Sequence, residues 1–192
     1  MNNIGLGAIG FLIIHVSDYI SLKRISLLKP IVWLLGGGIL AYSIFQLCFT
    51  TARFSVPWWL TGLGWVLLIL SLCALLYALF INLPFNKTYV KRGVGDKLIK
   101  TGFYALVRHP GVPAFIIMMI SLLLVSGSQQ LVTAVPIYIL LDIVLVILQD
   151  KFYFPRMFPG YGSYQQETPM LVPNRQSIRA FIQSVRRSAM DN

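Results

Sequence analysis

The stretch that decides the fold covers residues 111–150 and reads GVPAFIIMMISLLLVSGSQQLVTAVPIYILLDIVLVILQD. It holds two apolar runs, 113–125 and 131–148, with Gly127 to Gln130 between them. A helix that spans a membrane needs about 20 mostly apolar residues, so the second run is long enough and the first is short. Loops of about two to five residues join antiparallel helices. The stretch therefore predicts a tight hairpin of two membrane helices.

Three further apolar runs precede this hairpin, at residues 4–22, 31–49 and 58–83. Apolar residues make up 57% of the 192-residue chain and charged residues 11%, whereas soluble domains average about 45–50% and about 25%. This composition excludes a water-soluble domain, and a disordered chain would need low hydrophobicity and high charge. The sequence predicts an all-α, polytopic membrane protein with five transmembrane helices, forming a single membrane domain over residues 1–192.

The basic residues predict the orientation of these five spans. They cluster after the first span, between the third and the fourth, and after the fifth, so that every one except Arg53 falls on one side. Because basic loops stay in the cytoplasm, we expect the N-terminus outside and the C-terminus inside, in the cytoplasmic membrane. The formal charge of +10 indicates membrane lipids as partners and no nucleic acid.

Two segments, 86–112 and 149–173, are polar enough to leave the membrane, and both fall on the cytoplasmic side. They can therefore meet each other and a soluble cofactor. The first contains LIKTGFYALVRHP at 98–110, which ends at the entry to the fourth span. Proline is tolerated in a first helical turn, and the free N–H groups there can hold an anionic group. His109 either makes structural hydrogen bonds or acts on a ligand.

The second segment begins where the fifth span ends, at Asp150. A carboxylate at this boundary either pairs with a lysine or arginine or faces a cationic ligand. Tyr153, Tyr161 and Tyr164 follow, and tyrosines here are typical of an interfacial aromatic belt.

The tail, residues 174–192, has a pattern of its own. Asn174 is a candidate N-cap. Arginines surround apolar residues at helical spacing, which are Ile178, Phe181, Ile182 and Val185. The pattern predicts a C-terminal basic amphipathic helix on the cytoplasmic leaflet, and the alternative is a solvated tail.

Together the two polar segments resemble the isoprenylcysteine carboxyl methyltransferase and phospholipid methyltransferase family of integral membrane methyltransferases. The first family signature, which is similar to Leu-Val-x-x-Gly-x-Tyr-x-x-x-Arg-His-Pro-x-Tyr, is matched in register by Leu98, Ile99, Gly102, Tyr104, Arg108, His109 and Pro110. The second has an acid, a phenylalanine eight residues later, two tyrosines and two prolines, matched by Asp150, Phe158, Tyr161, Tyr164, Pro169 and Pro173. The resemblance covers residues 96–173.

The resemblance implies that S-adenosyl-L-methionine binds at the cytoplasmic face between the two segments. It implies a cofactor site made of Leu98, Ile99, Tyr104, His109, Pro110, Gly111, Val112 and Asp150. Asp96 and Lys97 fall within the same cofactor-contacting stretch. His109 and Arg108 are the candidate catalytic residues, with His109 as the proton acceptor if the substrate is an amine.

Two departures from the family pattern keep an alternative open. Val112 stands where the family has a tyrosine, and one acid, Asp150, stands where the family has two. The chain is therefore either a methyltransferase or a non-catalytic membrane protein on the same scaffold.

Three ionisable residues lie within the apolar runs: His15, Asp18 and Asp142. Such groups usually face the interior of a helix bundle. Asp142 either lines a substrate cavity or makes a structural hydrogen bond. A small transporter built around these three residues is the least favoured alternative.

The leading hypothesis is an S-adenosylmethionine-dependent methyltransferase acting on a lipidic or apolar small molecule. Its methyl acceptor, a carboxyl, thiol or amine, stays undecided. The chain has no Cys, His, Asp and Glu cluster with metal-ligand spacing, so we expect no metal.

Overall fold

The computed structural model describes residues 2–23, 25, 28–83 and 98–190. Asp96, Lys97 and the first part of segment 86–112 lie outside these residues. Within them the chain is helical and contains no strand, apart from an isolated bridge between Arg53 and Ser128. The prediction of an all-α protein is therefore confirmed over the described residues.

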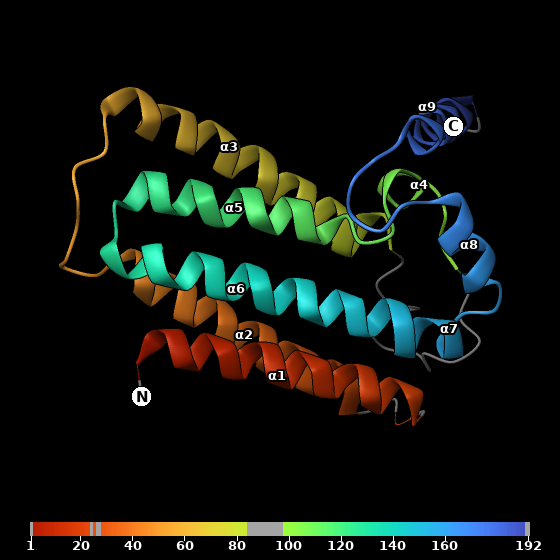
Figure 1. Cartoon of the computed structure of the whole chain (residues 1–192), viewed down its shortest axis with the longest axis horizontal. Coiled ribbons are helices and arrows are strands. Elements are labelled where there is room, and N and C mark those ends of the chain that lie inside the picture. The colour runs from red at the N-terminus through yellow and green to blue at the C-terminus, as the bar shows by residue number, and fades with distance from the viewer. Residues whose placement is uncertain (1, 24, 26–27, 84–97, 191–192) are drawn as a thin grey trace.

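Five long helices form the body of the molecule (Figure 1). They are α1 (Asn3–Leu22), α2 (Leu28–Cys48), α3 (Trp58–Leu76), α5 (Gly111–Ser126) and α6 (Gln129–Leu148). A π-helical turn extends α3 as η1 (Tyr77–Ile81), and another extends α6 as η3 (Gln149–Tyr153), which leads into α7 (Phe154–Met157).

Four of these helical segments are long and apolar enough to cross a membrane: 3–22, 28–48, 58–81 and 129–157. The chain is therefore an integral membrane protein by the length and composition of its helices. The fourth predicted span, 113–125, forms the apolar helix α5, which at 16 residues is shorter than the others.

Local sequence explains where these helices begin and end. The Asn2 side chain accepts a 2.8 Å hydrogen bond from the Gly5 N–H and caps α1. Gly127 ends α5 in the left-handed conformation, at φ 61°, and its N–H donates to the Leu123 carbonyl. A Cβ at Gly127 would lie 2.6 Å from the Phe54 carbonyl oxygen, so both its conformation and its surroundings require glycine. The predicted hairpin therefore turns in two residues between α5 and α6.

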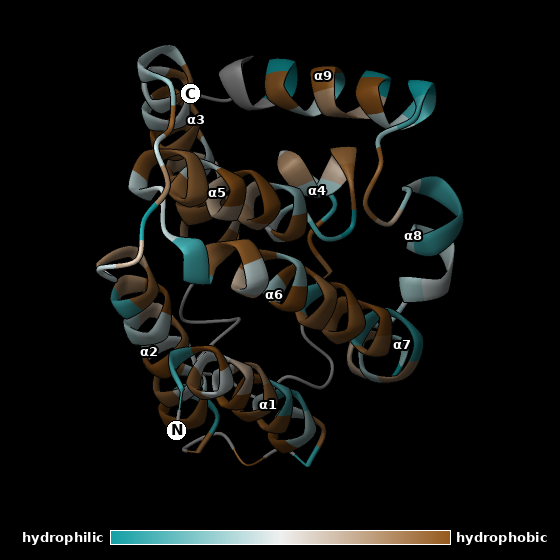
Figure 2. Cartoon of the chain, turned by 60° about the vertical axis from the view of Figure 1, so that its left-hand side comes forward, coloured by the Kyte–Doolittle hydropathy of each residue, from teal (hydrophilic) through white to brown (hydrophobic). Residues whose placement is uncertain are grey.

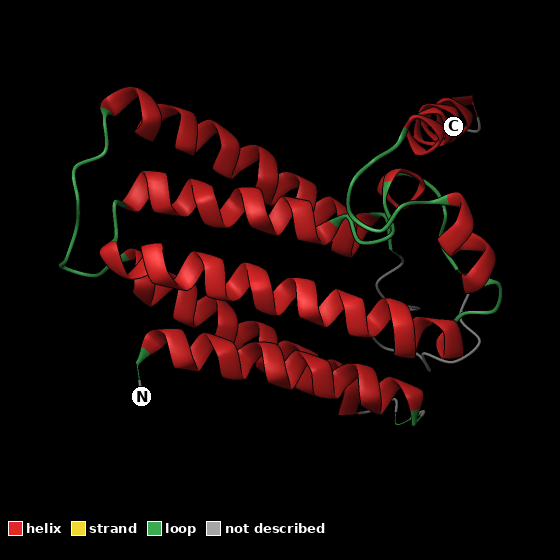
Figure 3. Ribbon diagram, viewed as in Figure 1, coloured by secondary structure: helices red, strands yellow, loops and turns green. Residues whose placement is uncertain are grey.

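Glycines allow the closest helix packing. A Cβ at Gly10 of α1 would lie 2.9 Å from the Gly36 carbonyl oxygen of α2, and one at Gly36 would lie 2.9 Å from the Gly10 carbonyl oxygen. Small residues at a helix crossing let two backbones touch, which stabilises helix pairs in membranes. In Figure 3, α6 lies between the α1–α2 pair and the α3–α5 pair, and it contacts α1, α2 and α5.

The two ends of the bundle differ. The end that holds the start of α1 is closed by Tyr138, whose hydroxyl lies 2.7 Å from Ser43 Oγ and donates to the carbonyls of Asn3 and Ile4. Tyr138 and Ser43 are fully buried. The opposite end carries the short helices α4 (Phe103–Leu106), α7 and α8 (Tyr161–Glu167), together with α9 (Arg175–Met190) (Figure 1).

The predicted tail helix forms as α9. Asn174 caps it, because its Oδ1 accepts a 2.8 Å hydrogen bond from the Ser177 N–H. Phe181 packs on Phe103 with ring centroids 6.0 Å apart, while three apolar side chains stay exposed: Ile178, Ile182 and Val185. Figure 1 views α9 down its axis while the long helices run across the page, so α9 crosses them steeply. Figure 2 shows apolar and polar residues alternating along it.

Candidate functional site

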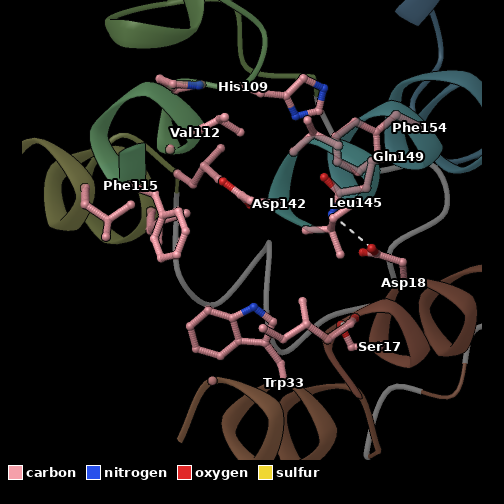
Figure 4. Close-up of a pocket in the computed structure, with 18 of the residues that line it drawn as sticks. Ser17, Asp18, Trp33, His109, Val112, Phe115, Asp142, Leu145, Gln149 and Phe154 are labelled. Carbon is pink, nitrogen blue, oxygen red and sulfur yellow. Dashed lines mark hydrogen bonds between the residues drawn. The ribbon is translucent and has the colours of Figure 1, made fainter. Parts of the chain in front are cut away.

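A cavity of about 930 Å³ opens between the helices at the end that carries α4, α7 and α8. Residues of α1, α2, α3, η1, α5 and α6 line the part between the long helices, called its inner part below, and residues of segment 98–112 and of helices α7 and α8 line the rest, its outer part. Figure 4 labels members of both parts, among them Trp33 and Phe154. Cavities that bind small molecules in proteins usually measure about 300–1,000 Å³. The volume is therefore large enough for a nucleoside-sized molecule together with part of a second ligand.

Two backbone hydrogen bonds join the two polar segments. The Arg108 N–H donates to the Pro169 carbonyl at 2.9 Å, and the His109 N–H donates to the Met170 carbonyl at 3.2 Å. Val112 is buried beside this junction, where it packs with Leu145 of α6 and with Met170. The two segments that the sequence singled out thus meet beside the cavity.

A turn at Gly102 sets the path of the first segment into the cavity. Gly102 has φ +60°, and a Cβ there would collide with the Asn82 side chain. Asn82 clamps this turn, because its Oδ1 accepts from the Phe103 N–H at 2.8 Å and its Nδ2 donates to the Thr101 carbonyl at 3.1 Å. The clamp fixes where α4 starts and so where Tyr104 enters the cavity wall.

Asp150 is the centre of a hydrogen-bond network behind the wall of the outer part of the cavity. Arg108 donates to it in bidentate fashion, from Nε to Oδ1 at 2.8 Å and from Nη2 to Oδ2 at 2.9 Å. Tyr161 adds a 2.7 Å bond to Oδ1, and Gln165 adds a 3.0 Å bond to Oδ2. Both partners of the ion pair are below 10% exposed, at 9% for Arg108 and 8% for Asp150. A buried ion pair of this kind needs such additional donors to offset its desolvation.

Arg108 also ties the second segment to the network. Its Nη1 donates to the main-chain carbonyls of Gln165 and Thr168. The guanidinium therefore satisfies a side chain of η3 and the carbonyls at the end of α8 at the same time. A planar fork of donors is suited to such a role, and lysine is not.

His109 lies between the network and the cavity. Its Nε2 is 3.4 Å from Asp150 Oδ1, and its ring stacks on Phe154 at 5.6 Å with 14° between the planes. A carboxylate only accepts hydrogen bonds, so Nε2 carries the proton and Nδ1 is the basic nitrogen. Burial lowers the pKa of His109 from its ordinary 6.5, against the opposing effect of Asp150, so the ring is neutral at neutral pH.

Tyr161 and Tyr164 are not belt residues. They are 2% and 1% exposed, and each makes a specific bond, Tyr161 to Asp150 at 2.7 Å and Tyr164 to the Tyr104 carbonyl at 2.6 Å. Burial and the neighbouring Asp150 raise the pKa of Tyr161 above its ordinary value. It is therefore a permanent donor to the carboxylate.

The structure brings nearly all of the predicted site residues to one cavity. Those that line it are Leu98, Ile99, Tyr104, Arg108, His109, Pro110, Gly111, Val112 and Asp142. Asp150 is not among the described residues that line the cavity. Of the two roles left open for it, pairing with an arginine is the one observed, so Asp150 positions Arg108 and His109 from behind the wall.

The π-helical turn η3 changes which residues face the cavity. Along α6 and at the first residue of η3, the lining residues Asp142, Leu145, Val146 and Gln149 have an α-helical spacing. Continued without interruption, that spacing would bring Tyr153 and Arg156 to the cavity. The lining residues after the turn are instead Phe154, Met157 and Phe158, and the first two lie one position later than the α-helical spacing predicts. A π turn accommodates one extra residue and rotates the helix beyond it, so η3 turns Phe154 toward His109.

The inner part of the cavity is mostly apolar. Phe115 of α5, Trp33 of α2 and Asp142 of α6 form part of its wall (Figure 4). Asp18 does not pair with His15, which lies one turn away. Instead, Asp18 Oδ2 accepts a 2.9 Å hydrogen bond from Gln149 Nε2.

Sequence reasoning missed Gln149, Gln165, Asn82 and Phe154. A helical signal was present for Gln149, which lies seven residues after Asp142 and so on the same face. Gln165 and Asn82 act through contacts between segments far apart in the chain, for which local spacing gives no signal.

The chain matches no protein-family model, no curated protein and no solved structure. Function therefore has to be argued from the cavity and from the resemblance of its two motifs.

Proposed function

We propose that the chain is an S-adenosylmethionine-dependent methyltransferase of the isoprenylcysteine carboxyl methyltransferase-like type, acting on a lipidic or apolar substrate. One observation carries this proposal. Seven of the eight residues that the resemblance assigns to the cofactor line one cavity, and the eighth, Asp150, bonds to one of those seven, His109, and to the candidate catalytic residue Arg108. Residues chosen only for motif register converge on one site.

The residues present fit the proposed cofactor. The cavity volume of about 930 Å³ exceeds what a nucleoside needs, and aromatic rings such as Phe154 and Tyr104 line it, as suits a sulfonium cation. When bound, S-adenosylmethionine supplies an activated methyl group on sulfur. Segment 98–112 and Phe154 would hold this cofactor in the outer part of the cavity.

The chain's own contribution is positioning and the exclusion of water. Methyl transfer needs alignment of the donor and the acceptor more than acid or base chemistry. The Asp150 network fixes Arg108 and the His109 ring. Neutral His109 presents Nδ1 as an acceptor for a substrate proton, while the apolar inner part of the cavity keeps an acceptor group dehydrated.

We further propose that this site faces the cytoplasm, that α5 also crosses the membrane as the fourth of five spans, and that the N-terminus lies outside. The basic residues support this orientation, since all except Arg53 come after the odd-numbered spans. The steep crossing of α9 over the long helices (Figure 1) is what a helix lying on the membrane surface would show. A C-terminal green fluorescent protein fusion should fluoresce and a C-terminal alkaline phosphatase fusion should be inactive; the reverse result refutes the orientation.

The proposal is tested through cofactor binding, by calorimetric titration of the purified protein with S-adenosylmethionine in maltoside micelles. We expect micromolar binding, lost in His109→Ala and weakened at least tenfold in Asp150→Asn. Glu167→Gln is the matched control, because it removes the same charge from a surface carboxylate that pairs with Lys100. Absence of binding to folded wild-type protein refutes the proposal.

One observation favours the second candidate, a non-catalytic protein on this scaffold. Both oxygens of Asp150 are already engaged by side chains of the chain itself, so this acid is not open to a ligand. The same titration separates the two candidates.

A further inference from the structure

Asp142 is a polar group with an unused bonding capacity inside the cavity. It lies on α6, on the same face as Leu145 and Gln149, and it lines the cavity. No described residue donates a hydrogen bond to its buried Oδ2. The network at Asp150 does not reach this position, since eight residues of a helix correspond to about 12 Å.

Other polar side chains of the inner cavity have partners in the chain. Asp18 accepts from Gln149 at 2.9 Å, and the Ser17 and Ser21 hydroxyls donate to main-chain carbonyls at 2.7 and 2.9 Å. A buried carboxyl group without a hydrogen-bond donor is costly, and a donor in the cavity beside it lowers that cost. Asp142 is therefore placed to accept a hydrogen bond from a ligand.

The surroundings of Asp142 restrict what that ligand can be. Val112, Phe115 and Leu145 flank it (Figure 4), and Val112 and Leu145 belong to one buried apolar cluster. A phosphate or carboxylate held here would be desolvated against carbon, and it would also be repelled when Asp142 is ionised. An amine on an apolar body satisfies both conditions, because it donates to the acid and buries its chain among these side chains.

We propose that Asp142 binds the amino group of a lipophilic amine, and that this cavity discriminates against carboxylates and against amines carried beside a phosphate. The inference names the substrate class of the proposed methyltransferase, and its relevance to a reaction rests on that proposal. The binding itself does not.

The experiment titrates wild-type protein in maltoside micelles with decylamine, decanol, decanoate and lysophosphatidylethanolamine. We expect decylamine to bind at least about tenfold more tightly than the other three, since a charged hydrogen bond exceeds a neutral one. Asp142→Asn should remove this preference. Glu167→Gln, with the same change of charge outside the cavity, should retain it.

Equal binding of decanoate or lysophosphatidylethanolamine, or an unchanged preference in Asp142→Asn, overturns the inference. The comparison of the four probes on wild-type protein gives a result even if the variant fails to fold. S-Adenosylmethionine is titrated into the same samples. Decylamine binding without cofactor binding refutes the methyltransferase and keeps the amine site, and the reverse result refutes the amine site alone.

Discussion

Asp150 and Asp142 lie on one continuous helical segment and are held in opposite ways. Asp150 accepts hydrogen bonds from Arg108, Tyr161 and Gln165 at 2.7–3.0 Å, whereas Asp142 has an oxygen that no described residue satisfies. Side chains of the protein itself occupy both oxygens of the Asp150 carboxylate, whereas the Asp142 carboxyl group remains available to a ligand. The comparison teaches that the acid matching a motif need not be the acid that meets a substrate.

The largest effect should come from removing the satisfied carboxylate. Asp150→Ala leaves the buried Arg108 without its counter-ion, and breaking a buried pair on one side costs about 3–5 kcal/mol. We expect the free energy of unfolding in mixed micelles to fall by that amount. Removing both partners in Arg108→Met/Asp150→Leu should cost less than the sum of the single changes. Additive costs would show that the two side chains do not act as a pair.

Replacing the arginine that donates to Asp150 should separate the effect of its charge from that of its hydrogen-bond geometry. Arg108→Lys keeps the charge but loses the planar fork that joins Asp150 to the carbonyls of Gln165 and Thr168. Loss of bonds to a charged group costs about 1.5–3 kcal/mol. Thermal unfolding should report this loss. A lysine variant as stable as wild type would mean that charge alone holds the segments together.

The unsatisfied carboxylate should respond with the opposite sign. Asp142→Leu removes a buried acceptor that lacks a partner, so we expect the unfolding free energy to rise by about 1–3 kcal/mol. Glu167→Gln is the control and should change it by less than about 1 kcal/mol, because its pair with Lys100 is exposed. Destabilisation by Asp142→Leu would indicate a structural role for this acid.

The smallest effect concerns the pH dependence at His109. Burial lowers the pKa of His109 below its ordinary 6.5, so the unfolded chain binds a proton more readily than the folded one. Stability from neutral His109 is therefore present above pH 6.5 and is lost as the pH falls below it. His109→Gln should remove this component, seen as the difference between the unfolding midpoints of the two proteins from about pH 7 to about pH 5. If the unfolding midpoints of the two proteins change in parallel with pH, a group other than His109 takes up the proton.

The sequence predicted most of the helices because their apolar runs are long. It placed the second span at 31–49, while α2 starts at Leu28, since proline at position 30 is compatible with a first helical turn. It ended the fifth span at Leu148, where polar residues begin, although the helix continues to Met157 through η3. Hydropathy marks where a chain becomes polar, which is not where its hydrogen bonding stops being helical.

The sequence predicted which residues form the candidate site better than it predicted what each of them does. Motif register selected residues such as Tyr104 and His109 that the fold gathers in one cavity. It did not reveal that Asp150 is sequestered by Arg108, because that depends on donors from α8 and on the backbone pairing of Arg108 with Pro169. Contacts between distant segments are set by tertiary packing, and a single sequence carries no local signal for them.

The extra residue accommodated by η3 has a consequence for how such a protein changes over generations. The rod from Gln129 to Met157 would remain a membrane helix without it, but every residue after the turn would point about 100° away. Deleting exposed Lys151 therefore tests whether one codon separates a plain helical anchor from a chain that can assemble this cavity. Insertions and deletions of single residues, more than substitutions, are then the step by which such a pocket can be gained or lost.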